Sequence, residues 1–276
     1  MRRIRWLGAL GVLLWLTGAL WTLAQRPIEV TPEMLRRVLE DFEVGDNWIY
    51  NDLERAEQRA RETGKPLFVL FRCVPCEACK AFDQEVLRAD QELRELLAQY
   101  VPVRIVRMNQ VDLGRFQYDY DLSWAAFLMN ADGTVYGRYG IRAGHDSESH
   151  ISVASLKRAL RRGLELHREY PQNRHLFAGK EARPVRFRFA EEMFPLQRAI
   201  QEEDLRKGCV HCHMIKEAQI QIAQREGTWS KEKIWEFLVW PLPENVGMVM
   251  EVDLGNVIRA VLPGSFAERA GLQPGR

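Results

Sequence analysis

Residues 65–80 read KPLFVLFRCVPCEACK, an apolar run that leads directly into a group of cysteines. Residues 67–71 are uniformly apolar, which is typical of a strand buried on both faces of a sheet. A helix is predicted to follow from about residue 76 to 87. The cysteines of the stretch are Cys73, Cys76 and Cys79. Because the first turn of a helix stabilises a thiolate through unpaired amides and the helix dipole, the stretch predicts a reactive cysteine after a central strand.

The pair Cys76 and Cys79 has the spacing of a redox-active dithiol. With two residues between them, the second sulfur reaches the first across one helical turn, so the pair can alternate between dithiol and disulfide. We predict that Cys76 attacks as the catalytic nucleophile and that Cys79 resolves the mixed disulfide. Two alternatives stay open. One is an inert disulfide between strand and helix, and the other is a soft-metal site in which Cys73 joins the pair to bind copper(I) or zinc.

The sequence on either side of this stretch alternates between helical and strand patterns. The predicted helices cover residues 53–63, 90–97 and 153–166, with Gly64 ending the first and Asp90 capping the second. Residues 101–108 form a predicted strand, and the turn residues Asp132 and Gly133 join strands 125–129 and 134–139 into a hairpin. Buried strands interleaved with helices predict an α/β fold, with helices on both faces of a mixed sheet.

The cysteine stretch resembles the active-site segment of the thioredoxin superfamily, with the Cys-x-x-Cys-Lys portion aligned on the redox motif. The resemblance covers roughly residues 47–168 and implies a thioredoxin-like sheet. It also implies thiol–disulfide oxidoreductase or electron-transfer activity on protein thiols, protein disulfides or redox partner proteins. A carrier or scaffold that binds copper or zinc without turnover is the alternative function.

Three positions depart from the pattern of that superfamily. Pro75 stands where a tryptophan usually precedes the first cysteine, and Leu70 stands where a buried acid usually lies. Ala125 takes the place of the cis-proline expected in the loop at residues 122–126. In the superfamily that proline keeps metal ions off the thiols, so its absence leaves metal binding open.

A second pair of cysteines lies in residues 209–213, which read CVHCH. Residues 191–214 are predicted to be helical, which would place Cys209 and Cys212 one turn apart. This motif is typical of c-type haem attachment, in which the two thiols bond the vinyl groups and the adjacent His213 binds the iron. The motif therefore predicts haem c as a cofactor and a one-electron centre beside the thiol pair.

The cysteine count agrees with that prediction but does not require it. Five cysteines cannot all pair in intramolecular disulfides, whereas two thioethers would leave three thiols. The alternatives for the second pair are a disulfide between Cys209 and Cys212, or a zinc site that adds His211 or His213.

Residues 241–276 resemble the first half of a bacterial PDZ domain. The loop of Val246, Gly247, Met248 and Val249 matches the loop that receives a peptide C-terminus by strand addition. A core cannot be buried by about 30 residues alone, so we expect a truncated, β-rich PDZ-like module. The whole order of segments resembles multidomain periplasmic proteins that combine thioredoxin-like and PDZ domains.

The N-terminal residues 1–24 have the composition of an export signal. Three arginines, at positions 2, 3 and 5, precede an uncharged apolar run over residues 7–24. This pattern predicts a cleaved signal peptide or a retained membrane anchor, because its length is near the minimum for a spanning helix. We therefore expect a periplasmic or otherwise extracytoplasmic protein, attached to the inner membrane if the segment is retained.

The remaining segments and the charge balance complete the expected organisation. Residues 25–46 are predicted to form a helical spacer capped by Thr31, and residues 169–240 a linker followed by the helical CVHCH segment. The chain has 39 basic and 38 acidic residues, so it lacks the basic excess typical of nucleic-acid binding.

Overall fold

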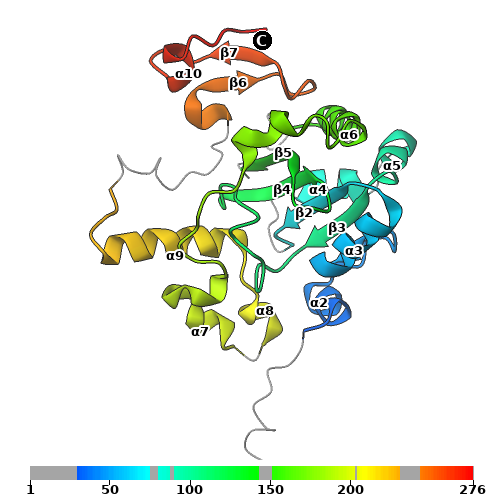
Figure 1. Cartoon of the computed structure of the whole chain (residues 1–276). Coiled ribbons are helices and arrows are strands. Elements are labelled where there is room, and N and C mark those ends of the chain that lie inside the picture. Colours follow the sequence, from blue (N-terminus) through cyan, green and yellow to red (C-terminus); the bar gives the residue numbers. More distant parts are fainter. Residues whose placement is uncertain are drawn as a thin grey trace, which may run out of the picture.

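The computed structural model describes residues 30–74, 80–87, 90–142, 151–202, 204–230 and 243–275. A mixed sheet of five strands, in the order β1-β3-β2-β4-β5, forms its centre (Figure 1). Its strands are β1 (Ile49–Tyr50), β2 (Leu67–Arg72), β3 (Val101–Ile105), β4 (Leu122–Met129) and β5 (Val135–Arg142). The first three are parallel, and β4 and β5 are antiparallel to their neighbours. All residues of the central strand β2 are buried, as its apolar sequence predicts.

Local sequence signals set the ends of the helices around the sheet. These helices are α3 (Leu53–Thr63), α4 (Lys80–Leu87), α5 (Gln91–Leu97) and α6 (Val153–Arg168). Gly64 ends α3 in the left-handed conformation, with φ of 64°. Asp90 caps α5 by accepting a hydrogen bond from the amide of Leu93 at 2.8 Å. The expected α/β fold is confirmed.

Two expected boundaries within the sheet are wrong. The strand predicted over residues 101–108 ends at Ile105, after which the chain turns. Residues 122–126, expected to form a loop, belong to β4, where Ala125 pairs with Phe71 of the central strand. Pairing with a buried neighbour satisfies the backbone groups of this apolar segment, which a loop would leave without partners.

The two faces of the sheet carry separate core clusters, because alternate residues of a strand point to opposite faces. Phe68 and Leu70 of β2 belong to the first core cluster, which includes residues of α4, α5 and α6. Leu67, Val69 and Phe71 belong to the second core cluster, which includes residues of α3 and of a helix in the C-terminal half. This division separates the buried side chains of the described residues into two groups, one on each face of the sheet.

The predicted N-terminal spacer contains helix α2 (Pro32–Leu39), which packs on the first core cluster. Thr31 caps it and accepts a hydrogen bond from the amide of Met34 at 3.2 Å, as predicted. Its side chains Leu35 and Leu39 are buried. The helix therefore covers part of one face of the sheet.

The single helix predicted over residues 191–214 is wrong. The chain instead forms short turns and helices: η4 (Ala190–Glu192), η5 (Phe194–Leu196), α7 (Gln197–Ile200) and α8 (Leu205–Gly208), followed by α9 (Cys212–Arg225). Upstream lies another short helix, η3 (Arg174–Lys180). Pro195 lacks an amide hydrogen and so limits helix continuation. Residues 209–211 are extended between α8 and α9, and tertiary hydrogen bonds hold them there, as described below.

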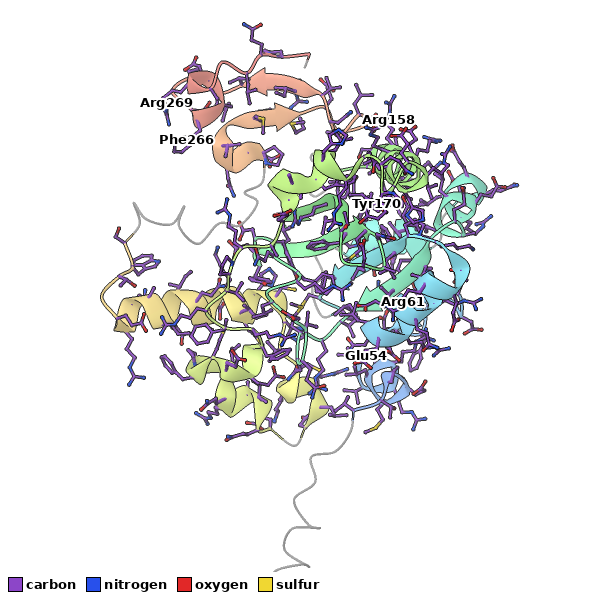
Figure 2. The ribbon with its side chains drawn as sticks, viewed as in Figure 1. Glu54, Arg61, Arg158, Tyr170, Phe266 and Arg269 are labelled. Atoms are coloured by element: carbon purple, nitrogen blue, oxygen red, sulfur yellow. The ribbon has the colours of Figure 1, made fainter. Side chains whose placement is uncertain are left out.

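The C-terminal residues form a small hairpin and helix at the top of Figure 1: η7 (Pro243–Val246), β6 (Met248–Met250), β7 (Ile258–Val261) and α10 (Phe266–Arg269). Strands β6 and β7 are antiparallel. On α10, the guanidinium of Arg269 lies 4.5 Å from the ring centre of Phe266, and both residues are labelled in Figure 2.

Within the described part of the chain, no helix has the length and apolar character needed to cross a membrane. Residues 1–24, which carry the predicted signal peptide or anchor, lie outside that part.

Candidate thiol site

The candidate site lies where the central strand passes into a helix on the first face of the sheet. Strand β2 ends at Arg72 and α4 is described from Lys80, so residues 73–79 lie between a buried strand and a helix. The predicted start of this helix at about residue 76 lies outside the described residues. Cys73 is a half-buried thiol at the strand end. Cys76 and Cys79, the predicted catalytic pair, lie outside the described residues.

A buried group of four charges joins the two ends of this connection. Arg72 lies directly before it and Asp83 follows it on α4, and the Arg72 Nε atom is 3.3 Å from Asp83 Oδ2. Arg104 of β3 donates two hydrogen bonds to the same carboxylate, at 2.7 Å and 2.8 Å. Arg104 also donates to Asp41, with its Nε atom 2.8 Å from Asp41 Oδ2. Two arginines thus face two carboxylates, and the group is close to neutral in a buried position.

Sequence reasoning missed this buried charge group. Leu70 indicated only that the usual acid is missing from β2, whereas the buried acids here are Asp83 on α4 and Asp41 after α2. The available signal was Arg104, a charged residue inside the apolar strand 101–105, since a buried arginine requires acidic partners. Tyr50 also belongs to the group, because its hydroxyl donates to Asp41 at 3.0 Å. Burial raises the pKa of Tyr50, and the Asp41 carboxylate raises it further.

The CVHCH segment is held in an extended form against the loop after β3. The Val210 carbonyl accepts a hydrogen bond from the Met108 amide at 2.8 Å, and the Val210 amide donates to Asn109 Oδ1 at 2.8 Å. Asn109 Nδ2 donates in turn to the Gly208 carbonyl at 3.3 Å. These bonds explain why the predicted helix is interrupted here, because tertiary partners replace the bonds within a helix.

The two cysteines of the segment consequently enter different core clusters. Cys209 follows α8, is only 1% exposed and belongs to the first core cluster, whereas Cys212 is the first residue of α9 and belongs to the second. Both are thiols in the structure. His213 donates a hydrogen bond from Nε2 to the carbonyl of Asp121 at 3.0 Å.

Cys212 lies in an aromatic pocket of the second core cluster. Its sulfur is 2.9 Å from the Tyr118 hydroxyl, and the Tyr118 ring packs on Phe71 with centres 5.3 Å apart. Burial raises the pKa of the Cys212 thiol to about 12, the Tyr118 hydrogen bond opposes this rise, and the nearby Cys73 thiol adds to it. Cys212 is thus protonated at neutral pH and close enough to Cys73 for the two to interact electrostatically.

This arrangement does not fit a covalent haem. Both thiols must face one porphyrin to bond its vinyl groups, but Cys209 and Cys212 point into different clusters. In addition, His213 Nε2 donates a hydrogen bond to the carbonyl of Asp121, so this nitrogen does not serve as an iron ligand in the arrangement described. A zinc site is not assembled either, because the described residues contain no group of three or more side chains suited to a metal ion.

The predicted peptide-binding loop lies at the start of strand β6. Val246 ends η7, Gly247 has a φ of 88°, and Met248 and Val249 pair with Val261 and Ala260 of β7. A side chain at Gly247 would meet Ser265 at 2.1 Å, so the close approach of this loop to α10 requires glycine. In the described residues β6 pairs with β7 alone, which leaves one strand edge for an added strand. Peptide binding at this loop stays a prediction.

Comparison with known proteins identifies the sheet that carries the thiol site. Residues 48–131 match the sequence model of a thioredoxin-like family. These residues form a thioredoxin-like domain. The matched segment runs from β1 to the turn after β4 and includes the stretch with Cys73, Cys76 and Cys79. No curated protein is similar enough to the chain to count as a match. The domain indicates a redox function in thiol–disulfide chemistry in general.

Proposed function

We propose that this protein is an extracytoplasmic thiol–disulfide oxidoreductase that acts on protein thiols or disulfides through Cys76 and Cys79. The observation that carries the proposal is the connection between β2 and α4 in a thioredoxin-like domain. This connection contains both cysteines, and the N-terminus of a helix that follows such a strand end favours a thiolate close to it.

The proposed reaction balances as a two-electron exchange. The Cys76 thiolate attacks one sulfur of a substrate disulfide, forms a mixed disulfide and releases the first substrate thiol. Cys79 then attacks the Cys76 sulfur, the second substrate thiol leaves, and the enzyme retains a Cys76–Cys79 disulfide. Two electrons and two protons pass to the substrate, and a redox partner protein returns the enzyme to the dithiol form.

The buried charge group of Asp41, Arg72, Asp83 and Arg104 supports this proposal by fixing the ends of the cysteine connection. Arg72 precedes the connection, Asp83 follows it, and Arg104 holds Asp83 from the neighbouring strand. A support of this kind holds the strand end and the helix after it in a fixed arrangement, which favours the orientation that thiol exchange requires. The haem expected at residues 209–213 is left out of the proposed mechanism, because the arrangement there does not fit it.

The proposal is tested by reduction of insulin disulfides by the purified protein, followed as turbidity with dithiothreitol as electron source. We expect activity in the wild type and its loss in Cys76→Ser, while Cys73→Ser retains it. Titration of accessible thiols before and after mild reduction provides a second measurement. Reversible appearance of two thiols agrees with the oxidoreductase. An inactive protein with three thiols that only copper(I) or zinc protects would instead establish the metal carrier.

A further inference from the structure

The alternation of side chains at the end of β2 directs Cys73 toward the face of the sheet that α9 covers. Side chains alternate along an extended strand, and Phe71 of β2 belongs to the second core cluster. Arg72 points to the opposite face, where it meets Asp83, and Val74 packs on the first core cluster. The intervening Cys73 therefore points to the same side as Phe71.

Cys212 reaches this side from the C-terminal half of the chain. The Phe71 ring contacts Tyr118, and the Tyr118 hydroxyl is 2.9 Å from the Cys212 sulfur, so the Tyr118 side chain links Cys212 to the Phe71 ring of β2. The electrostatic interaction between the two thiols agrees with this placement. Cys209 is on the other face, in the first core cluster.

The two thiols differ in their access to solvent. Cys73 is half-buried, whereas Cys212 is 7% exposed. Cys73 is thus the more accessible of the two to a dissolved disulfide. In such a pair the accessible thiol is oxidised first and the buried thiol resolves the product.

We propose that Cys73 and Cys212 form a second dithiol pair, which closes into a disulfide when the protein meets an oxidising disulfide compound. The proposal extends the proposed function but uses neither Cys76 nor Cys79. The oxidised form would join α9 covalently to the end of the central strand, beside the cysteine connection. This pairing replaces the haem and the Cys209–Cys212 disulfide as the chemistry of the CVHCH segment.

With glutathione disulfide as the oxidant, the atoms and electrons of this reaction balance in two steps. Cys73 attacks glutathione disulfide, forms a mixed disulfide and releases one glutathione. The Cys212 sulfur then attacks the Cys73 sulfur, and the second glutathione leaves with the proton of the Cys212 thiol. The protein loses two hydrogens and one molecule of glutathione disulfide becomes two of glutathione.

The test uses the full chain with Cys76→Ser and Cys79→Ser, which leaves Cys73, Cys209 and Cys212 as its cysteines. The protein is incubated with glutathione disulfide, remaining thiols are alkylated, and tryptic peptides are analysed by mass spectrometry. We expect the peptide of residues 73–80 to be disulfide-linked to that of residues 208–216. Adding Cys212→Ser should abolish the link, and adding Cys209→Ser, the matched control, should preserve it.

Other products overturn the proposal. They are a disulfide between Cys209 and Cys212, glutathione that stays bound to Cys73, or haem bonded to the peptide of residues 208–216. A circular dichroism melting curve for each variant ensures that a lost link does not come from unfolding, and Cys212→Ala serves if the serine variant fails to fold. Because the test protein lacks Cys76 and Cys79, its result is independent of the insulin assay.

Discussion

Arg104 of β3 holds Asp83 of α4 by two parallel hydrogen bonds, although both residues are buried. Asp83 also lies 3.3 Å from Arg72, the last residue of the central strand. The strand before the cysteine connection and the helix after it are thereby attached to one carboxylate. Stability and activity should therefore be linked at Asp83.

The first prediction concerns the free energy of unfolding. Asp83→Ala leaves Arg72 and Arg104 buried with only Asp41 to offset their charge, so we expect a loss of about 3 to 5 kcal/mol. Glu85→Gln, an exposed change on the same helix, should cost no more than about 0.5 kcal/mol. Urea denaturation followed by circular dichroism measures both. A loss of only about 1 kcal/mol for Asp83→Ala would mean that the pair behaves like an exposed salt bridge.

The second prediction separates the roles of the three clustered cysteines. Cys76→Ser should lower the rate of insulin reduction at least about 1000-fold, because removal of a catalytic nucleophile removes the covalent step. Cys73→Ser should change only the rate or the metal affinity. If Cys73→Ser abolished turnover and Cys76→Ser did not, the attacking thiol would be Cys73.

The third prediction is a pH dependence caused by the buried Cys212 thiol. Its pKa rises from the ordinary value of 9.0 to about 12 in the folded protein, so above pH 9 the unfolded chain releases a proton that the folded chain retains. The contribution of this thiol to stability is complete below pH 9 and is lost as the pH rises toward 12. We therefore expect this thiol to lower the free energy of unfolding by about 1.4 kcal/mol for each pH unit in this window.

Comparison with Cys212→Ala isolates this contribution, because burial also raises the pKa of Tyr118 and Tyr120 above the ordinary value of 10.0, so these tyrosines retain protons that the unfolded chain releases at high pH. Denaturation of both proteins at pH 8, 9 and 10 should show that their difference in unfolding free energy shrinks above pH 9. If the difference in unfolding free energy between the two proteins stayed constant with pH, the Cys212 thiol would have the pKa of a solvent-exposed cysteine and the prediction would be wrong.

The fourth prediction concerns haem. Protein produced in a host with haem-attachment machinery should lack a Soret band that survives denaturation and acid–acetone extraction, because the thiols at 209 and 212 enter different clusters. His213→Ala should loosen the packing of α9 through loss of the Asp121 hydrogen bond, without altering the visible spectrum. Covalent haem in the wild type would show that residues 209–213 rearrange before or during attachment.

The fifth prediction is export, which rests on the arginine-led apolar run of residues 1–24. After fractionation of cells that express the full chain, the protein should be found in the periplasm or attached to the inner membrane. Soluble cytosolic protein that retains residues 1–24 would contradict the proposed location.

Local sequence signals were sufficient for most of the thioredoxin-like sheet and its helices. The apolar run 67–71 predicts β2, Asp90 predicts the start of α5, and Gly64 predicts the end of α3. The turn at Asp132 and Gly133 predicts the hairpin of β4 and β5. These features depend on residues within a few positions of one another, so their physical causes can be read from a short stretch of sequence.

Only the tertiary structure decided how distant residues meet. Val210 is extended because Met108 and Asn109 supply its backbone partners, which the spacing of the two cysteines could not indicate. The helical interpretation of residues 191–214 failed for this reason, and with it the geometry expected for haem. Asp83 and Arg104 meet because α4 packs on the face of the sheet to which Arg104 of β3 points, and Tyr118 and Cys212 meet because the loop after β3 and helix α9 pack together in the second core cluster. The sequence by itself determined the helices and strands of the sheet domain and the candidate cysteines. Packing determined which thiols share a face, since burial and pairing depend on the whole fold.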